Sequence, residues 1–365
     1  MGDDRYDKAE RRTAWLFLAP FLILLSVFFF FAAIRSAWFS LTEYNLFDPP
    51  KFIGLSNYVQ LVTDPLFGLA LRNSLTFAIF VTVSQTVLAM LLAVFVNRIA
   101  HAKGLTRTIF YFPSIVSSTV MTLIFLWLFQ RQGIVTDMIN WAQNHGAHIL
   151  SFVTVLVIVQ AALVLRARRS YVDVRAADPF FLLFAVLAAI LVTFALRLGQ
   201  VLPVGTLTEP ISWLNTRDTL LFMPRTMWAI AVMNIFTTVP TMMLLYLAGL
   251  QSISGALYEA ADIDGATKWQ QFRKITVPLL APVTFAVVTL GLIGTLQMFD
   301  QVAILGNAAP IESRVTLGYY TYYNTFPPGG SPRIGMASAG AICLGILTLV
   351  IVFLQRRLGI SDKGI

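Results

Sequence analysis

The chain has 365 residues, of which 57% are hydrophobic and only 12% are charged. Soluble domains carry about twice this share of charged residues, which excludes an ordinary water-soluble protein. The net charge of +8 comes from basic residues at the ends of apolar runs, a pattern that indicates orientation in a membrane rather than nucleic-acid binding. We therefore expect an all-α polytopic membrane protein with lipid as a partner and no nucleic acid.

About eight transmembrane helices are expected, because eight apolar segments approach the roughly 20 residues that cross a bilayer. The first segment is longer than the core of a signal peptide, about 7–15 residues, so it is predicted to stay as an uncleaved membrane helix. In chain order the segments are 13–34, 74–96, 108–129, 149–165, 179–196, 223–250, 276–299 and 334–354.

Lysine and arginine concentrate in alternate loops if all eight segments span the membrane. The N-terminus, the four arginines between 166 and 175, the loop 251–278 and the C-terminus then lie on one side. By the positive-inside rule we expect that side to be cytoplasmic. Lys51, Arg131 and Arg217 fall on the opposite side, so the bias is not absolute.

The polar stretch 259–278, between the sixth and seventh segments, has its own helical order. Helix-forming residues lie on both sides of Gly265, and glycine supplies a tight turn that a residue with a Cβ resists. The pattern predicts two short helices folded at Gly265. Glu259 is expected to begin the first helix, where the helix dipole favours a carboxylate.

This stretch resembles the loop that defines the permease subunits of binding-protein-dependent ABC transporters. That loop reads Glu-Ala-Ala, three residues, Gly, nine residues, then Ile-x-Leu-Pro. Val277 stands where the family usually has leucine. The matching positions are Glu259, Ala260, Ala261, Gly265, Ile275 and Pro278.

Further stretches resemble the maltose and glycerol-phosphate branch of this family. They are Phe17-Leu18-Ala19-Pro20, Phe39-Ser40-Leu41-Thr42-Glu43-Tyr44-Asn45, Phe52-Ile53-Gly54-Leu55-Ser56-Asn57-Tyr58 and Thr108-Ile109-Phe110-Tyr111-Phe112-Pro113. The resemblance implies a multi-pass permease subunit in the plasma membrane of a bacterium or archaeon, importing a sugar or oligosaccharide. Glycerol 3-phosphate or another polyol is the alternative substrate. The implied partners are a second homologous permease, two ABC ATPase subunits and an extracytoplasmic solute-binding protein.

The chain itself is not expected to be an enzyme or to hold a cofactor or metal. No nucleotide-binding Gly-x-x-x-x-Gly-Lys-Ser/Thr motif is present, so a separate ATPase must supply the energy. An autonomous secondary carrier is a weaker alternative, because the paired intramembrane acids of ion coupling are missing. His101, His145 and His148 are expected to be solvated loop residues.

The loop 251–278 is expected to dock on the ATPase. An exposed Glu259 can accept hydrogen bonds from a basic partner side chain, and small residues allow close helix approach. Aromatic residues are the anchors that dominate interfaces. The predicted ATPase-coupling residues are Glu259, Ala260, Ala261, Gly265, Trp269 and Phe272.

Permeases of this type commonly have six core spans, so the two spans within 144–205 are interpreted as an inserted hairpin. An even number of inserted spans keeps the docking loop on its side of the membrane. The predicted division is 1–143, 144–205 and 206–365. The arginines of the hairpin turn serve orientation or, alternatively, contact anionic lipid.

The substrate pathway is expected to use polar side chains of the last spans, because polar groups in a bilayer are costly unless they face protein or water. Thr237 and Thr241 flank the same helical face as Asn234. Tyr319, Tyr320, Tyr322 and Tyr323 either offer faces to a sugar ring or form an interfacial belt. Helix–helix contacts are the alternative role for each pathway residue. The predicted pathway residues are Asn234, Thr238, Gly291, Thr295, Met298 and Gln297.

Overall fold

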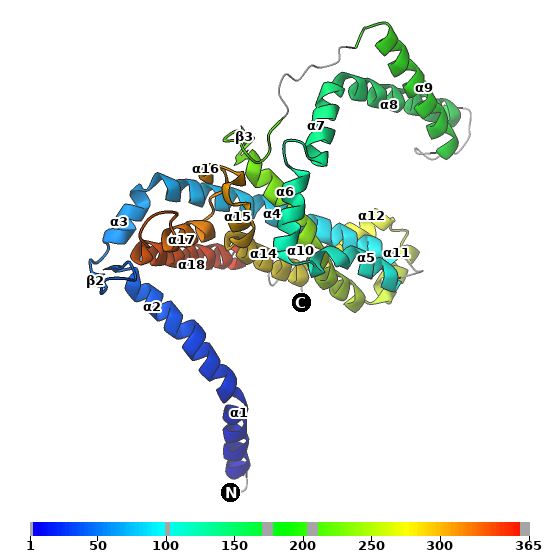
Figure 1. Cartoon of the computed structure of the whole chain (residues 1–365). Helices are drawn as coiled ribbons and strands as arrows, with labels where there is room; N and C mark the ends of the chain where they lie inside the picture. The colour runs from blue at the N-terminus through cyan, green and yellow to red at the C-terminus, as the bar shows by residue number, and fades with distance from the viewer. Residues whose placement is uncertain (1–2, 99–102, 170–177, 203–210, 358–365) are drawn as a thin grey trace. The chain divides into compact units, whose positions relative to one another are not determined.

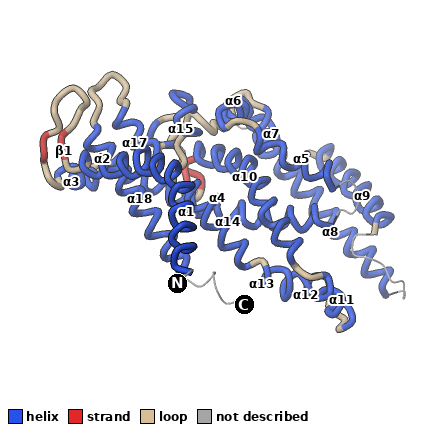
Figure 2. Tube along the Cα trace, turned by 90° about the horizontal axis from the view of Figure 1, so that it is seen from below, coloured by secondary structure: helices blue, strands red, loops and turns tan. Residues whose placement is uncertain are grey.

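The computed structural model describes residues 3–98, 103–169, 178–202 and 211–357, and most of them are helical (Figures 1 and 2). Two antiparallel two-stranded hairpins pair Thr42–Glu43 (β1) with Lys51–Phe52 (β2), and Thr219–Leu220 (β3) with Met223–Pro224 (β4). The all-α prediction is confirmed. His101, Arg175 and most of the arginine-rich turn lie outside the described residues.

Seven helices in the described part of the chain are long and apolar enough to cross a membrane, or eight if one bent pair counts as a span. About eight spans were predicted. The helices are Glu10–Phe39, Pro65–Asn97, Gly146–Arg169, Pro179–Leu198, Arg225–Ser252, Ala281–Ala308 and Ile334–Arg357.

The bent pair occupies the apolar segment predicted at 108–129, which the structure divides into two helices. The chain forms α5 (Lys103–Ile115) and α6 (Ser118–Leu128), and their axes differ by 96°. Pro113 lies in the last turn of α5, where its ring and missing N–H weaken the helix. Ser117 directly precedes α6, and its hydroxyl accepts a hydrogen bond from the Val120 N–H at 3.4 Å, as an N-cap residue does.

The chain divides into two compact units, residues 1–125 with 215–365, and residues 126–214. The smaller unit holds α7 (Ile134–Asn144), α8 (Gly146–Arg169) and α9 (Pro179–Leu198). The larger unit holds the hairpins and the remaining helices. The predicted insertion bounds 144–205 stay a prediction.

The larger unit begins with α1 (Asp3–Leu25), the π-helical turn η1 (Ser26–Phe30), α2 (Phe31–Phe39), α3 (Ser56–Thr63) and α4 (Pro65–Arg98). It continues after the smaller unit with α10 (Arg225–Ser252), α11 (Gly255–Ile263), α12 (Lys268–Gln271), η2 (Phe272–Thr276), α13 (Val277–Leu279) and α14 (Ala281–Leu296). It ends with α15 (Asp300–Leu305), η3 (Gly306–Ala308), α16 (Ile311–Arg314), α17 (Leu317–Thr325) and α18 (Ile334–Arg357).

The core of the larger unit lies where α4 packs against α10 and α14. Ala89 and Ala93 on α4 are fully buried and face Met243 and Tyr246 of α10 within one apolar cluster. Small residues let membrane helices approach closely, and the large side chains opposite fill the space. This packing therefore sets the distance between α4 and the later helices in the arrangement seen here.

His148 corrects the expectation of solvated loop histidines. The smaller unit's α8 begins at Gly146, ahead of the apolar run, so His148 lies inside the helix and is buried. His145 lies between α7 and α8, stacks on Trp141 at a ring distance of 4.9 Å and contacts the Trp141 carbonyl through Nδ1 at 2.9 Å. The helix start, which the sequence pattern placed later, explains the difference.

Candidate functional site

The loop 253–280 joins α10 to α14 and forms the two predicted short helices. The chain reverses between α11 and α12 at Gly265, whose φ is +74°. A residue with a Cβ is strained in such a conformation, whereas glycine adopts it freely. No heavy atom beyond its chain neighbours lies within 4 Å of a Cβ built at Gly265, so the backbone angle and not crowding requires glycine there.

Reciprocal hydrogen bonds fix the start of α12. The Thr267 hydroxyl accepts the Gln270 N–H at 3.3 Å, and the Gln270 carboxamide accepts the Thr267 N–H at 2.7 Å. Such a capping box satisfies two backbone donors that a helix start leaves unpaired. The second helix is therefore defined locally, within a few residues of the glycine turn.

Asp262 ties the two short helices together. Its carboxylate accepts the Lys268 ammonium at 2.8 and 3.0 Å and the Gln271 carboxamide N–H. Gln271 is buried and also accepts from Lys268 at 3.3 Å. The hydrogen bond from Lys268, followed by that from Gln271, holds the pKa of Asp262 below its usual value. This carboxylate therefore stays ionised at neutral pH and links α11 to α12.

Glu259 does not begin a helix, which corrects the expectation from sequence. Ser254 is the N-cap of α11, and Glu259 is the fifth residue of that helix. The helix dipole favours acids only in the first turn, so the dipole argument does not apply to it. Glu259 and Ala260 are exposed, and Ile263 on the same face is 88% exposed.

The predicted aromatic anchors differ in exposure. Trp269 is 68% exposed, whereas Phe272 is half-buried, and their rings lie 5.6 Å apart. Ala261 is half-buried on the inner side of α11. The outward surface of the loop therefore carries a carboxylate, small residues, an aliphatic side chain and an indole ring.

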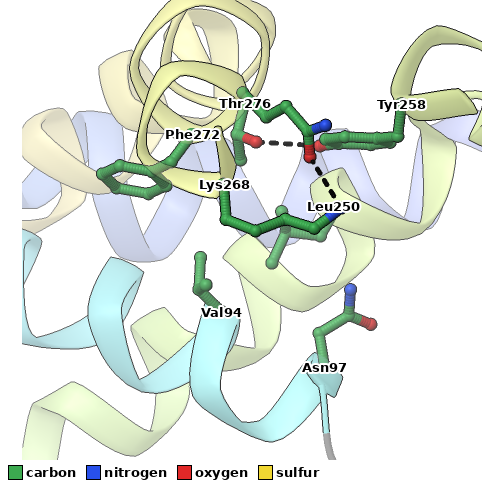
Figure 3. Close-up of a pocket in the computed structure, with 8 residues that line it drawn as sticks. Val94, Asn97, Leu250, Tyr258, Lys268, Phe272 and Thr276 are labelled. Atoms are coloured by element: carbon green, nitrogen blue, oxygen red, sulfur yellow. Dashed lines mark hydrogen bonds between the residues drawn. The ribbon is translucent and has the colours of Figure 1, made fainter. Parts of the chain in front are cut away.

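A cavity of about 430 Å³ lies between this loop and the ends of α4 and α10 (Figure 3). Tyr258 and Thr276 close one side through a 2.9 Å hydroxyl–hydroxyl hydrogen bond. The Lys268 side chain extends along the cavity and donates to Gln271 (Figure 3). The residues that line the cavity are Val94, Asn97, Leu250, Tyr258, Lys268, Gln271, Phe272 and Thr276.

The structure brings four of the predicted pathway residues into one buried polar cluster inside the larger unit. Thr238 on α10 donates to the Gln85 carboxamide oxygen of α4 at 2.9 Å. Asn234 donates to Gln301 Oε1 at 3.2 Å. The cluster, named the polar seam below, consists of Thr82, Gln85, Asn234, Thr238, Gly291, Thr295 and Gln301.

Gly291 and Thr295 line the α14 side of the polar seam. The Thr295 hydroxyl lies 3.4 Å from that of Thr82. A Cβ at Gly291 would collide with the Gln85 carboxamide and lie 3.2 Å from the Thr82 methyl group. Glycine at this position therefore provides the space that Gln85 occupies.

Met298 and Gln297 lie at the end of α14 and make no such bond within the polar seam. Met298 is buried, and its carbonyl accepts the Thr316 hydroxyl at 2.8 Å. Gln297 is exposed and ends the helix. Among the threonines flanking Asn234, Thr237 bonds to its own helix and Thr241 is exposed.

Among the residues that the structure describes, three buried side-chain atoms near the polar seam have no hydrogen-bond partner. They are Gln85 Nε2, Thr86 Oγ1 and Asn234 Oδ1. A buried polar group without a partner costs about 1–3 kcal/mol. The polar seam can therefore bind polar groups such as hydroxyls. Among the described residues, no group of three or more His, Cys, Asp and Glu is placed to hold a metal ion.

The four tyrosines of α17 are not equivalent. Tyr320 is buried and donates to Asp64 at 2.6 Å, and its pKa is raised, first by burial and then by this carboxylate. Tyr319 is buried under the Arg314 guanidinium at 4.5 Å. Tyr322 is 40% exposed and Tyr323 is half-buried. Tyr319 and Tyr320 therefore have structural contacts inside the protein.

Comparison with known proteins gives one family. The family model described as "Binding-protein-dependent transport system inner membrane component" matches residues 169–359. The chain is 28% identical to the lactose transport system permease protein LacF of Rhizobium radiobacter, over 93% of this chain and 92% of that protein. It is 27% identical to the trehalose/maltose transport system permease protein MalF of Thermococcus litoralis, over 95% and 94%.

The fold also matches a solved structure. A chain of a bacterial ABC transporter involved in the import of the acidic polysaccharide alginate superposes with a TM-score of 0.66. The match covers 97% of this chain and 98% of that chain, at 19% identity. The likeness therefore extends over the complete fold.

Proposed function

The chain belongs to the family of binding-protein-dependent transport system inner membrane components, and we propose that it is the permease subunit of an importer for a sugar or an oligosaccharide. The observation that carries the proposal is the substrate class of the relatives, which are named for lactose, trehalose/maltose and arabinooligosaccharides. Each aligns with more than 90% of this chain. This range of relatives does not favour glycerol 3-phosphate.

The proposed assembly contains a second homologous permease, two ATPase subunits and an extracytoplasmic solute-binding protein. The ATPases hydrolyse ATP, and the loop 253–280 transmits their movement. Support comes from the outward surface of the loop, where Glu259, Ala260 and Trp269 are exposed beside the rigid Asp262 network. An exposed apolar and acidic patch on a rigid support is suited to a groove with basic residues. Ala261 and Phe272 are half-buried behind this surface, and Gly265 makes the turn between its two helices.

Both termini and this loop are proposed to lie in the cytoplasm. The argument is the concentration of basic residues, including Arg166, Arg168 and Arg169 at the end of α8 and Arg356 with Arg357 at the end of α18. Basic residues near the ends of spans favour the cytoplasmic side. An ATPase in the cytoplasm then meets the loop directly.

The polar seam is proposed to line the substrate pathway, with Met298 and Gln297 following at the end of α14. Asn234, Thr238 and Thr295 offer hydrogen-bonding groups inside apolar helices, where polar residues are costly without a function. A sugar reaches them when α4 separates from α10 and α14 during alternating access.

Reconstitution tests the proposal. The chain is purified with its co-expressed permease, ATPases and binding protein, placed in liposomes, and assayed for uptake of labelled lactose, maltose and trehalose. Uptake of at least one of these sugars that requires ATP and the binding protein is expected. Uptake by this chain alone, driven by an ion gradient, contradicts the proposal and identifies a secondary carrier.

A further inference from the structure

Gln85 is the most buried polar side chain of the polar seam and stands near the middle of α4. It is 1% exposed, on the same face of the helix as Thr82, Ala89 and Ala93. Its carboxamide lies against Gly291 of α14 and within hydrogen-bond distance of Thr238 of α10. One side chain thus touches both helices that form the proposed pathway.

The hydrogen bonds of this carboxamide are incomplete. Its Nε2 is buried and has no hydrogen-bond partner within the described part of the chain. The Thr238 hydroxyl lies 2.9 Å from Gln85 Oε1 and 2.7 Å from the Asn234 carbonyl, but it has one proton and donates to one of them at a time. The carboxamide of Gln85 therefore keeps unused hydrogen-bonding capacity inside the seam.

A second buried glutamine shows what a purely structural role looks like. Gln355 of α18 is 7% exposed, accepts the Thr289 hydroxyl at 3.2 Å and donates to the Phe285 carbonyl at 3.2 Å. Both ends of that carboxamide join α18 to α14. Gln85 resembles Gln355 in burial, but only its Oε1 takes part in a contact between helices, so such contacts do not account for its Nε2 group.

Asn234, which also lies in the polar seam, has a carboxamide with one unpaired end, as Gln85 does. Its Nδ2 donates to Gln301, while its Oδ1 is buried without a partner. The polar seam thus holds an unused donor on α4 and an unused acceptor on α10. A sugar hydroxyl both donates and accepts hydrogen bonds, so it is the type of group that these two atoms match.

We infer that Gln85 is a substrate-contacting residue, and that its carboxamide binds a hydroxyl group of the sugar when α4 moves away from α10 and α14. The inference rests on the proposed function and extends it to a helix that the predicted pathway did not include. In the closed arrangement seen here, Gly291 provides the space for the carboxamide. In the open arrangement the sugar hydroxyl replaces that contact and completes its hydrogen bonds.

The test uses the assembled transporter in liposomes and a sugar that the wild type imports. Gln85→Leu is compared with Gln355→Leu, a matched change of a buried glutamine to an apolar residue of similar size. Uptake is measured for the parent sugar and for a set of its monodeoxy analogues, each lacking one hydroxyl. Thermal stability of each purified complex is measured in parallel.

For Gln85→Leu we expect KM for the parent sugar to rise by about 3–10-fold, the effect of one lost hydrogen bond. The wild type is expected to discriminate about tenfold against one deoxy analogue, and Gln85→Leu to reduce that discrimination to about twofold. Thermal stability of Gln85→Leu stays equal or rises, because an unsatisfied group is removed. Gln355→Leu lowers stability and leaves the discrimination pattern unchanged.

Equal discrimination by Gln85→Leu and the wild type across all analogues overturns the inference, and assigns the unused groups to water. A loss of stability in Gln85→Leu equal to that of Gln355→Leu, without a change in KM, overturns it as well. Failure of the wild-type transporter to import any sugar is a different result, because it rejects the proposed function and not only the role of Gln85.

Discussion

The loop 253–280 and the polar seam contrast in how they treat their polar groups. The loop is exposed, yet Asp262, Lys268 and Gln271 bond to one another and Thr267 caps its own helix. The seam is buried, yet Gln85 and Asn234 retain atoms without partners. The unpaired groups of the polar seam therefore lower the stability of the fold, whereas the polar groups of the loop 253–280 are paired although water could also bond to them.

This difference suggests different mechanical roles for the loop 253–280, which keeps its shape, and for the polar seam, which can rearrange. A loop that satisfies its own hydrogen bonds keeps its shape when a partner moves it. When the polar seam opens to a polar ligand, its unpaired groups form hydrogen bonds with that ligand. This favourable step offsets part of the free energy needed to separate α4 from α10 and α14. The loop 253–280 is therefore suited to transmit a movement of the ATPases, and the polar seam is suited to open in response to it.

Filling the space at Gly291 is expected to lower both stability and transport. In Gly291→Ala the new Cβ collides with the Gln85 carboxamide, and overpacking of this kind costs about 1–3 kcal/mol. We expect thermal stability to fall and uptake to drop by about tenfold or more. Adding Gln85→Ala to the same chain restores stability by removing the clash.

Gly294→Ala is the matched control for that prediction. It lies one turn later on α14, with open space around its Cβ position. Alanine is favoured over glycine in a helix by about 0.5–1 kcal/mol. Unchanged or improved stability is expected, and equal losses in both variants would remove the steric argument for the polar seam.

Gly265→Val tests the rigid loop at its turn. A β-branched residue at φ +74° strains the backbone, at a cost of about 1–2 kcal/mol. We expect ATP hydrolysis to continue while sugar uptake per ATP falls severalfold. Gly265→Asn, which tolerates this conformation better, should keep most of the coupling; loss in both would point to a requirement for the bare glycine surface.

Glu259→Lys tests the exposed face of α11. Reversing a charge at an interface leaves the partner's basic group facing another cation, which costs several kcal/mol. Uptake is expected to vanish and the ATPases to dissociate on size-exclusion chromatography. Glu259→Gln should weaken binding without abolishing it. Normal assembly of the Lys variant would exclude Glu259 from the ATPase contact.

The smallest effect is expected from titration of Asp262. Its lowered pKa in the folded loop means that the stabilisation is present above the ordinary aspartate value, about 3.9, and is lost as pH falls through the folded value. Coupling should therefore not change through Asp262 between about pH 5 and 8. Asp262→Asn, measured at neutral pH, should mimic the acid-induced loosening and change coupling only about twofold.

Local signals in the sequence predict the loop better than the polar seam. Gly265 is recognised from its own neighbours, because a turn of this type depends on one residue. The Glu-Ala-Ala pattern predicts a helix start at Glu259, whereas α11 begins at Gly255, directly after Ser254, a residue type common at N-caps. Asn234 was predicted as a polar residue in an apolar span.

Gln85 was missed for a physical reason. It is separated by 153 residues from Thr238, its hydrogen-bond partner, and helix packing alone brings the two together. A lone glutamine within the apolar segment 74–96 was the available signal. Its meaning depends on Gly291 opposite, a pairing that local patterns do not contain.

The first membrane helix has a consequence for the lipid environment. Glu10–Phe39 has 30 residues and a hydrophobic window with no buried residue, and at 1.5 Å per residue it extends about 45 Å. Its apolar part, residues 13–34, extends about 33 Å and so matches a hydrocarbon layer of about 30 Å, with Arg11, Arg12 and Arg35 at its ends. In a thinner bilayer this helix must tilt or bend, and its π-helical turn Ser26–Phe30 provides a place for bending. Bilayers built from longer or shorter acyl chains should therefore change its inclination, and hydrophobic mismatch becomes an external control on this end of the protein.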